Sequence, residues 1–144
     1  IGLRHAGCVA RLVAIFTAML GPSVIVWPQN PIRLMDDTEP EPEVALLKPG
    51  PDFYSKARPG PQDVLLLVEV ADSSLEKDQS IKVPMYAQAG IEILWIVNLI
   101  EDVVEVYSTP VAGTYAELRR ASHGETLPLP FAERISIAVD EIMG

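Results

Sequence analysis

The sequence is poor in cysteine, since Cys8 is the only one among 144 residues. A single thiol excludes any disulfide within the chain and cannot form a cysteine-rich zinc site. The simplest setting for such a protein is a reducing one, so we expect a cytoplasmic location. Cys8 has no histidine in a nucleophile arrangement beside it, which favours a buried, inert thiol.

The absence of several other motifs excludes some classes of active site. The chain contains no glycine-rich loop of the kind that cradles phosphates, no cysteine and histidine cluster for zinc and no serine-centred elbow. Positive charge is also scarce, because 11 lysines and arginines face 20 acidic residues, for a net charge of −9. This balance argues against a protein that coats nucleic acid by bulk electrostatics, but it permits an enzyme with a local basic rim. Candidates for such a rim are Lys56, Arg58, Arg119 and Arg120.

One uncharged run, residues 12–27, resembles a membrane segment at first sight. Spanning a bilayer takes about 20 consecutive apolar residues. Here Arg11 precedes the run and Gly21-Pro22 interrupts it. We therefore predict a buried helix over residues 5–20, followed by a strand, and no association with a membrane.

The alternation of apolar segments with turn residues predicts one α/β domain over residues 1–144, with a mixed β-sheet flanked by helices. The most apolar segment, residues 63–70, is expected to be a central strand that is buried on both faces. A helix over residues 73–89 should follow it, kinked at Pro84 and ended by Gly90. The remaining strands are expected at residues 24–29, 32–35, 43–47, 91–98, 102–107 and 114–120, with a short strand and a helical turn at 135–143.

A glutamate inside the central strand is the clearest sign of function. Burial of the Glu69 carboxylate is costly unless a partner neutralises it. Glu43 begins another strand, and two carboxylates that converge at strand ends attract a hard divalent cation. Asp78 and Lys82 share one face of the following helix. Spacing alone leaves two simpler interpretations open, namely a solvated carboxylate at Glu43 and a surface ion pair between Asp78 and Lys82.

Longer motifs in the chain resemble those of the Uma-type restriction endonuclease family, which belongs to the PD-(D/E)XK nuclease superfamily. The resemblance covers essentially the whole chain and is most specific between Glu69 and Trp95. The segments that carry it are Arg4-His5-Ala6, Gln29-Asn30-Pro31-Ile32-Arg33-Leu34, Glu39-Pro40-Glu41-Pro42-Glu43-Val44-Ala45-Leu46-Leu47, Val68-Glu69-Val70-Ala71-Asp72-Ser73-Ser74-Leu75-Glu76-Lys77-Asp78, Lys82, Tyr86-Ala87, Ala89-Gly90-Ile91, Trp95-Ile96-Val97 and Gly113-Thr114-Tyr115.

The resemblance implies a restriction-endonuclease-like fold and a phosphodiesterase that depends on Mg²⁺ or Mn²⁺. In that family pattern Glu43 and Glu69 would bind the metal, Lys82 would orient the water and the phosphate, and Asp78 would assist. The usual lysine of the superfamily, two residues after the second acid, would fall on Ala71. Glu43 stands where the family has aspartate, and its extra methylene displaces the carboxylate by about one bond length, ~1.5 Å.

Two hypotheses of function follow. The first is a metal-dependent endonuclease that acts on DNA, for which a homodimer would suit double-strand cutting, although no sequence feature fixes an interface. The second is a catalytically weak or inactive nucleic-acid-binding or interaction module that retains the fold. Related proteins begin with a further segment that contains a strand and an acidic residue, so we expect that the N-terminus here is incomplete. His5 resembles a family position near the site, but capping or core packing would explain it equally well.

Overall fold

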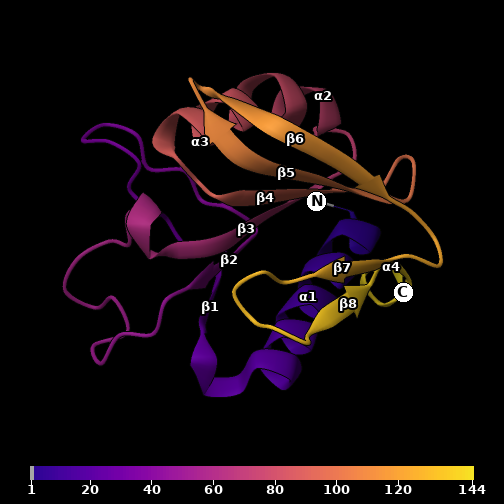
Figure 1. Ribbon diagram of the computed structural model, residues 1–144, viewed down its shortest axis with the longest axis horizontal. Helices are drawn as coiled ribbons and strands as arrows, with labels where there is room; N and C mark the ends of the chain where they lie inside the picture. Colours follow the sequence, from indigo (N-terminus) through magenta and orange to yellow (C-terminus); the bar gives the residue numbers. More distant parts are fainter. Residues whose placement is uncertain (1) are drawn as a thin grey trace.

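The computed structural model describes residues 2–144 and is built around a six-stranded sheet (Figure 1). The strands lie side by side in chain order, from β1 to β6. Only β3 and β4 are parallel neighbours, and every other pair in this sheet is antiparallel. The expected mixed α/β sheet is therefore confirmed. Its strands are β1 (Ile25–Pro28), β2 (Val44–Leu47), β3 (Val64–Ala71), β4 (Ile93–Asn98), β5 (Val103–Val111) and β6 (Thr114–Ala121).

The central position of β3 follows from its composition. All of its residues except Leu65 are buried, including both those that face α1 and those that face away from it. A strand that buries both faces must have strands on both sides and helices above and below. Because β3 and β4 run parallel, the chain crosses over between them through a helical segment. This crossover brings the predicted lysine back to the strand that carries Glu69.

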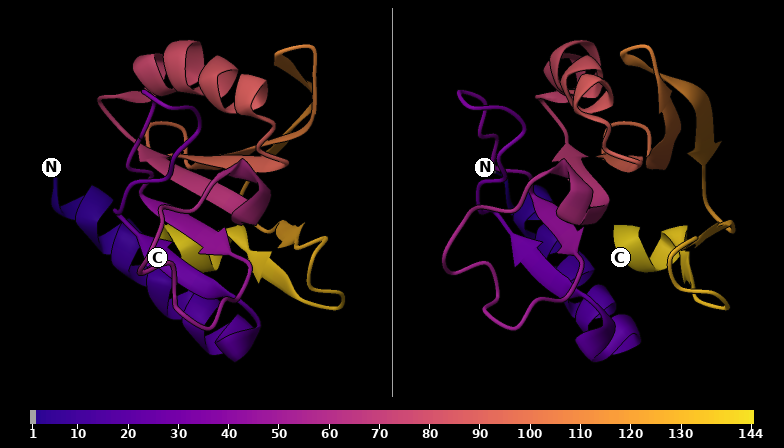
Figure 2. Two further views of the ribbon diagram at one scale, coloured as in Figure 1. Left: turned by 90° about the vertical axis from the view of Figure 1, so that its left-hand side faces the viewer. Right: turned by 60° about the vertical axis from the view of Figure 1, so that its left-hand side comes forward.

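Helices cover the sheet on opposite faces, as Figure 2 shows. On one face lies α1 (Leu3–Leu20), whose Leu12 and Phe16 are completely buried. The same face is covered by a C-terminal unit of β7 (Thr126–Pro128), β8 (Ser136–Ala138) and α4 (Val139–Met143). The segment Leu3–Ser23 is long and apolar enough to cross a membrane. Within it, Leu12 and Phe16 pack against the sheet, and the helix α1 includes the helix that the sequence predicted over residues 5–20.

The crossover helix is interrupted where the sequence predicted a kink. It consists of α2 (Leu75–Lys77), the π-helical turn η3 (Asp78–Lys82) and α3 (Val83–Ala89). Pro84 has no N–H to donate, and its ring would clash with the carbonyl four residues earlier in a regular helix. The wider π-helical turn directly before it accommodates this defect. Gly90 ends α3 in the left-handed conformation, at φ 79°.

One predicted strand is absent, and one observed strand was not predicted. Residues 32–35 form no strand and contribute only an isolated bridge between Met35 and Thr38. The N–H groups of the first three residues bond elsewhere in the loops, Ile32 to Pro40, Arg33 to Pro59 and Leu34 to Thr38, so these donors are not available to a neighbouring strand. The short strand β7 was missed, because its three residues contain only Leu127 as a buried apolar side chain.

Candidate active site

Glu43 and Glu69 lie beside one another because of the register between β2 and β3. Val44 pairs with Val68, so the next residues outward are the two glutamates. The backbone N–H of Glu43 points to Oε1 of Glu69 over a long 3.4 Å. Glu69 is only 2% exposed, as expected for a residue of a central strand. The structure thus brings the two predicted acidic residues to the same end of the sheet.

Lys82 and Tyr86 both reach Glu69 from the crossover helix. Nζ of Lys82 lies 3.3 Å from Oε2 of Glu69, and the hydroxyl of Tyr86 donates a hydrogen bond to the same oxygen over 2.7 Å. Alternation along β3 directs Glu69 to this face, away from Val68 and Val70 on the other. The buried carboxylate therefore has one cationic partner and one neutral donor, which is what its burial requires.

Asp78 is the second buried acid next to Lys82. It is 2% exposed, and its Oδ1 lies 3.2 Å from Nζ of Lys82. Oδ2 accepts a hydrogen bond from Ser74 over 3.2 Å, which ties it to the start of the helical segment. Lys82 is thus held between two buried carboxylates, and the interpretation of this pair as a surface ion pair was wrong.

His5 approaches Glu43 from the start of α1. Nε2 of His5 lies 2.6 Å from Oε2 of Glu43 and 3.0 Å from the carbonyl oxygen of Val70. The contact with Glu43 lacks the alignment of a hydrogen bond, since Oε2 of Glu43 is buried and accepts none. His5 therefore belongs to this cluster of side chains and does not cap the helix, whose N-cap residue is Gly2.

Electrostatics in the cluster follow from burial and from charge pairing. Burial raises the pKa of Glu69, and the nearby ammonium of Lys82 and hydroxyl of Tyr86 oppose that effect. For Lys82, burial lowers the pKa, but the carboxylates of Glu69 and Asp78 outweigh it, so that the pKa is raised. Lys82 is therefore positively charged. Burial also raises the pKa of the Tyr86 hydroxyl, so this group keeps its proton and donates a hydrogen bond.

The oxygen atoms of the cluster suit a hard cation such as Mg²⁺. Oε2 of Glu43 accepts no hydrogen bond, and Oε1 of Glu69 accepts only the long one from Glu43. Oε1 of Glu69 therefore retains a lone pair that a cation could use, whereas Oε2 of Glu43 is occupied by its 2.6 Å contact with Nε2 of His5. Among residues 2–144 no three histidine, cysteine, aspartate or glutamate side chains converge on one point, so these two glutamates would need water or substrate oxygens to complete the coordination.

A third buried acid, Glu105 on β5, contacts the same helical segment and was not predicted from the sequence. It is 1% exposed, and Nε2 of Gln79 lies 3.0 and 2.9 Å from its two oxygens. Asn98, Tyr107 and Arg120 also donate to this carboxylate. Because Gln79 belongs to η3, this network attaches the turn that contains Asp78 and Lys82 to the sheet. In sequence only the alternation of Glu105 with buried valines could have indicated it.

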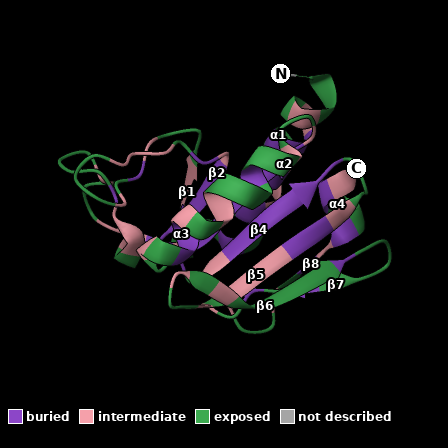
Figure 3. Cartoon of the chain, turned by 90° about the horizontal axis from the view of Figure 1, so that it is seen from above, coloured by how far each residue is buried: buried purple, intermediate pink, exposed green. Residues whose placement is uncertain are grey.

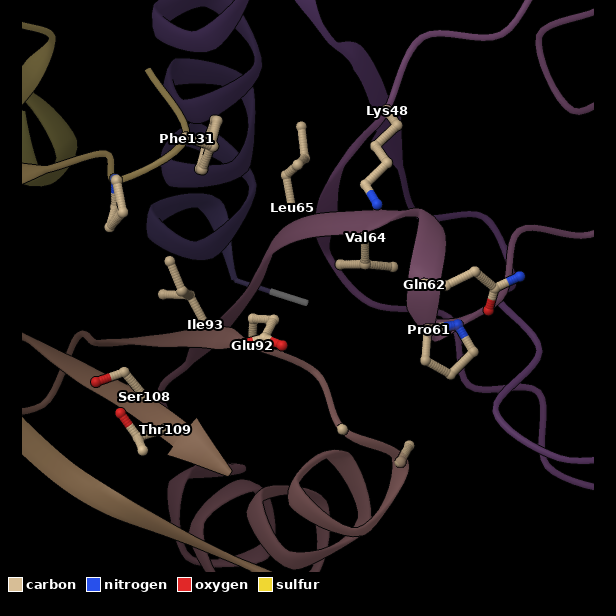
Figure 4. Close-up of a pocket in the computed structure, with 13 residues that line it drawn as sticks. Lys48, Pro61, Gln62, Val64, Leu65, Glu92, Ile93, Ser108, Thr109 and Phe131 are labelled. Carbon is tan, nitrogen blue, oxygen red and sulfur yellow. The ribbon is translucent and has the colours of Figure 1, made fainter. Parts of the chain in front are cut away.

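A groove shown in Figure 4 lies beside Val64, the first residue of β3, whereas Glu69 lies near the other end of that strand. It has a volume of about 950 Å³ and is lined by apolar side chains such as Val64, Ile93 and Phe131. Lys48 and Glu92 are its only charged lining residues. None of the predicted site residues lines this groove.

The expected basic rim is largely neutralised by ion pairs. Arg58 pairs with Glu39 in the loops, while Arg119 pairs with Glu125 and Arg120 with Glu101. The two parts of the supposed rim also come from different places, the loop before η2 (Pro61–Asp63) and strand β6. These residues do not form one continuous cationic surface.

The fold is similar to that of a known structure. A structure from Anabaena variabilis ATCC 29413, described as "a putative nuclease belonging to DUF820", superposes with a TM-score of 0.73 at 12% identity, over 99% of this chain and 82% of that one. No curated protein matches the sequence. The profile of the Uma2 family, described as "Putative restriction endonuclease", matches residues 2–140. The chain therefore belongs to the Uma2 family.

Proposed function

We propose that this protein is a metal-dependent endonuclease that hydrolyses phosphodiester bonds of DNA with Mg²⁺ or Mn²⁺, as a member of the PD-(D/E)XK nuclease superfamily. The observation that carries the proposal is the contact between Lys82 and Glu69 inside a buried cluster of acids. Its cytoplasmic location belongs to the same proposal and follows from the single buried cysteine.

Glu69 would hold the ion through Oε1, and Glu43 would join it with a carboxylate oxygen that is not in contact with His5. When bound there, a divalent ion would activate the attacking water and stabilise the negative charge on the phosphate. Tyr86 and Lys82 both contact Oε2 of Glu69, which leaves Oε1 as the oxygen for the ion.

Lys82 is the residue of the cluster that can act on the substrate. It is a cation with a partly exposed side chain, at 30%, while both of its carboxylate partners are buried. Its ammonium can therefore contact solvent and a phosphate oxygen without leaving Glu69 and Asp78. In that position it would orient the phosphate and the attacking water, and would stabilise the charge that develops during in-line attack. Asp78 would restrict the mobility of Lys82.

A non-cleaving, nucleic-acid-binding module is the competing function. One contact favours it, because Oε2 of Glu43 lies against His5, 2.6 Å from Nε2, on a side chain longer than the aspartate of the family pattern. A glutamate that remains against His5 would leave Glu69 as the sole acidic ligand of the ion.

Cleavage of supercoiled plasmid, together with DNA binding followed by fluorescence anisotropy, separates the two functions. We expect nicking with Mg²⁺ or Mn²⁺, none in EDTA, and loss of nicking in Glu69→Ala with little change in DNA affinity. Glu76→Ala, a change of an exposed glutamate on the adjoining helical turn, is the matched control. Binding without cleavage in both wild type and Glu69→Ala would establish the non-cleaving module instead.

A further inference from the structure

Strand β6 forms one margin of the sheet and is exposed on both of its faces. It pairs with β5 alone, and every residue from Ala116 to Arg120 is exposed (Figure 3). Leu118, in the middle, has 58% of its surface accessible. A strand with a free edge offers unpaired N–H and C=O groups to another strand, so proteins usually protect such edges.

The hairpin determines which backbone groups of β6 point outward. Ala112 and Gly113 form a two-residue turn, with φ of 52° and 80°, closed by the pair Val111 and Thr114. Two residues with positive φ are typical of a type I′ turn, whose closing pair is hydrogen-bonded. Alternation along an antiparallel pair then leaves the N–H and C=O groups of Glu117 and Arg119 directed away from β5. In the described part of the chain, no backbone hydrogen bond outside the strand pairing uses them.

The charges on this edge are complementary to themselves. Glu117 and Arg119 flank Leu118 on either side, and both side chains lie on the face opposite to that of Leu118. If a second β6 runs antiparallel with Leu118 opposite Leu118, each Glu117 faces an Arg119 of the other copy. Moving the symmetry axis by one residue in either direction places Glu117 opposite Glu117, or Arg119 opposite Arg119. Only the register centred on Leu118 brings opposite charges together.

We propose that β6 is a self-association surface, where a second copy of this chain adds its own β6 antiparallel, in the register centred on Leu118. In this register Glu117 of one copy and Arg119 of the other form hydrogen-bonded pairs. These are the residues whose N–H and C=O groups the hairpin directs away from β5. The two Leu118 side chains form the closer, non-hydrogen-bonded pair and shield one another from water. The sheets of the two copies become continuous, and the edge is covered.

The contacts that these side chains make within one copy are weak enough to rearrange. Arg119 pairs with Glu125 over 3.2 Å, both side chains being more than 40% exposed, and donates to the carbonyl oxygen of Thr126 over 3.1 Å, while Glu117 accepts a hydrogen bond from the exposed Thr109. Exposed pairs of this kind contribute little to stability. Since one strand pair is smaller than a standard interface of about 1,600 Å², we expect a weak dimer in rapid exchange. The inference does not depend on nuclease activity.

Sedimentation equilibrium of the whole chain tests the register. We expect the wild type to shift from monomer to dimer as its concentration rises through the high micromolar range. Glu117→Arg and Arg119→Glu each replace two attractive pairs with two repulsive ones, so each should weaken the dimer by roughly tenfold. The double variant Glu117→Arg/Arg119→Glu restores opposite charges in both pairs and should recover the wild-type constant within about threefold.

Controls of equal charge change are Glu133→Arg and Arg134→Glu, two exposed residues in the loop before β8, which should leave the dimer unchanged. Thermal unfolding at low protein concentration shows that each variant folds. A wild type that stays monomeric up to about 1 mM, above the range of the weak dimers that this interface size implies, overturns the proposal. So does a dimer that is insensitive to both single changes, or a double variant that fails to recover.

Discussion

Lys82 places its ammonium 3.3 Å from Oε2 of Glu69, although it comes from the crossover helix and not from the strand. The position two residues after Glu69 is Ala71, which is completely buried. The crossover helix, which packs on one face of the sheet, can therefore supply the lysine ammonium that the strand itself does not contain. The absence of lysine at residue 71 therefore does not by itself argue against a nuclease site.

Removal of the Tyr86 hydroxyl should disturb Glu69 while leaving the fold intact. Tyr86→Phe deletes a 2.7 Å hydrogen bond to Oε2 of Glu69 and keeps the buried ring. We expect a loss of about 1 kcal/mol in the free energy of unfolding, typical of one hydrogen bond. Because Glu69 loses part of its orientation, we also expect about a tenfold lower cleavage rate. Urea unfolding and single-turnover cleavage measure the two effects, and an unchanged rate would restrict Tyr86 to packing.

The stability of the metal-free protein should depend on pH through Glu69. Burial raises the pKa of Glu69 above its ordinary value of 4.5, so the folded state binds the proton more tightly than the unfolded state does. The stability from this group is fully present below the ordinary pKa and is lost as the pH rises through the raised one. Relative to Glu69→Gln, which cannot titrate, the wild type should lose stability across that window.

Urea unfolding in EDTA between pH 4 and pH 8 provides the test, and addition of Mg²⁺ should return stability to the wild type alone, because a ligand stabilises the state that binds it. A wild type that gains stability over Glu69→Gln as the pH rises would contradict the assigned direction of the shift. It would mean that Lys82 and Tyr86 outweigh the burial of Glu69.

Most strands of the sheet could be predicted because their amino-acid composition is typical of buried strands. The run from Val64 to Ala71 is apolar throughout, and the hairpin of β5 and β6 is divided by Gly113. The segment 32–35 was misjudged for the opposite reason, since its apolar residues follow Pro31 and bond across the loops. Local pattern cannot reveal where the N–H groups of such a segment find their acceptors.

The candidate site was partly predictable. Glu69 was marked by its position in an apolar strand, and the family resemblance added Lys82. The proximity of His5 to Glu43, and of Tyr86 to Glu69, depends on how α1 and the crossover helix pack on the sheet. Glu105 was missed because its partners come from β4, β6 and η3. These elements are distant from one another in the sequence and meet only in the folded chain.

Loss of the Glu105 carboxylate should destabilise the fold strongly. Glu105→Ala leaves donors from Gln79, Asn98 and Tyr107 without their buried acceptor. The buried donors left unpaired by such a loss cost roughly 1–3 kcal/mol each, and Arg120, which is exposed, can turn to solvent. Glu105→Gln keeps the shape and one acceptor oxygen, so we expect a loss of about half as much. Denaturant unfolding distinguishes these values, and equal small losses for both variants would show that the network contributes little.

Cys8 should be inert in the folded protein. Burial raises the pKa of its thiol from 9.0 to about 11, against the opposing effects of Arg11 and Arg4. At pH 8 the thiolate population is then about 100-fold lower than for a free cysteine, and the thiolate is the reactive form. We expect slow reaction with a thiol-specific reagent until the protein is unfolded in urea. Rapid reaction under native conditions would show that α1 opens away from the sheet.

The most direct measurement is the single-turnover rate of DNA cleavage by Lys82→Ala in saturating Mn²⁺, beside wild type and Lys77→Ala. Lys77 is an exposed lysine that ends α2, so its removal tests loss of charge without loss of the contact to Glu69. If Lys82 stabilises the transition state, its removal should lower the rate by roughly 10²–10³-fold, as for other electrostatic groups, while Lys77→Ala keeps the wild-type rate. Equal rates for all three proteins, or equal losses in both variants, would contradict the assignment of Lys82 to the active site.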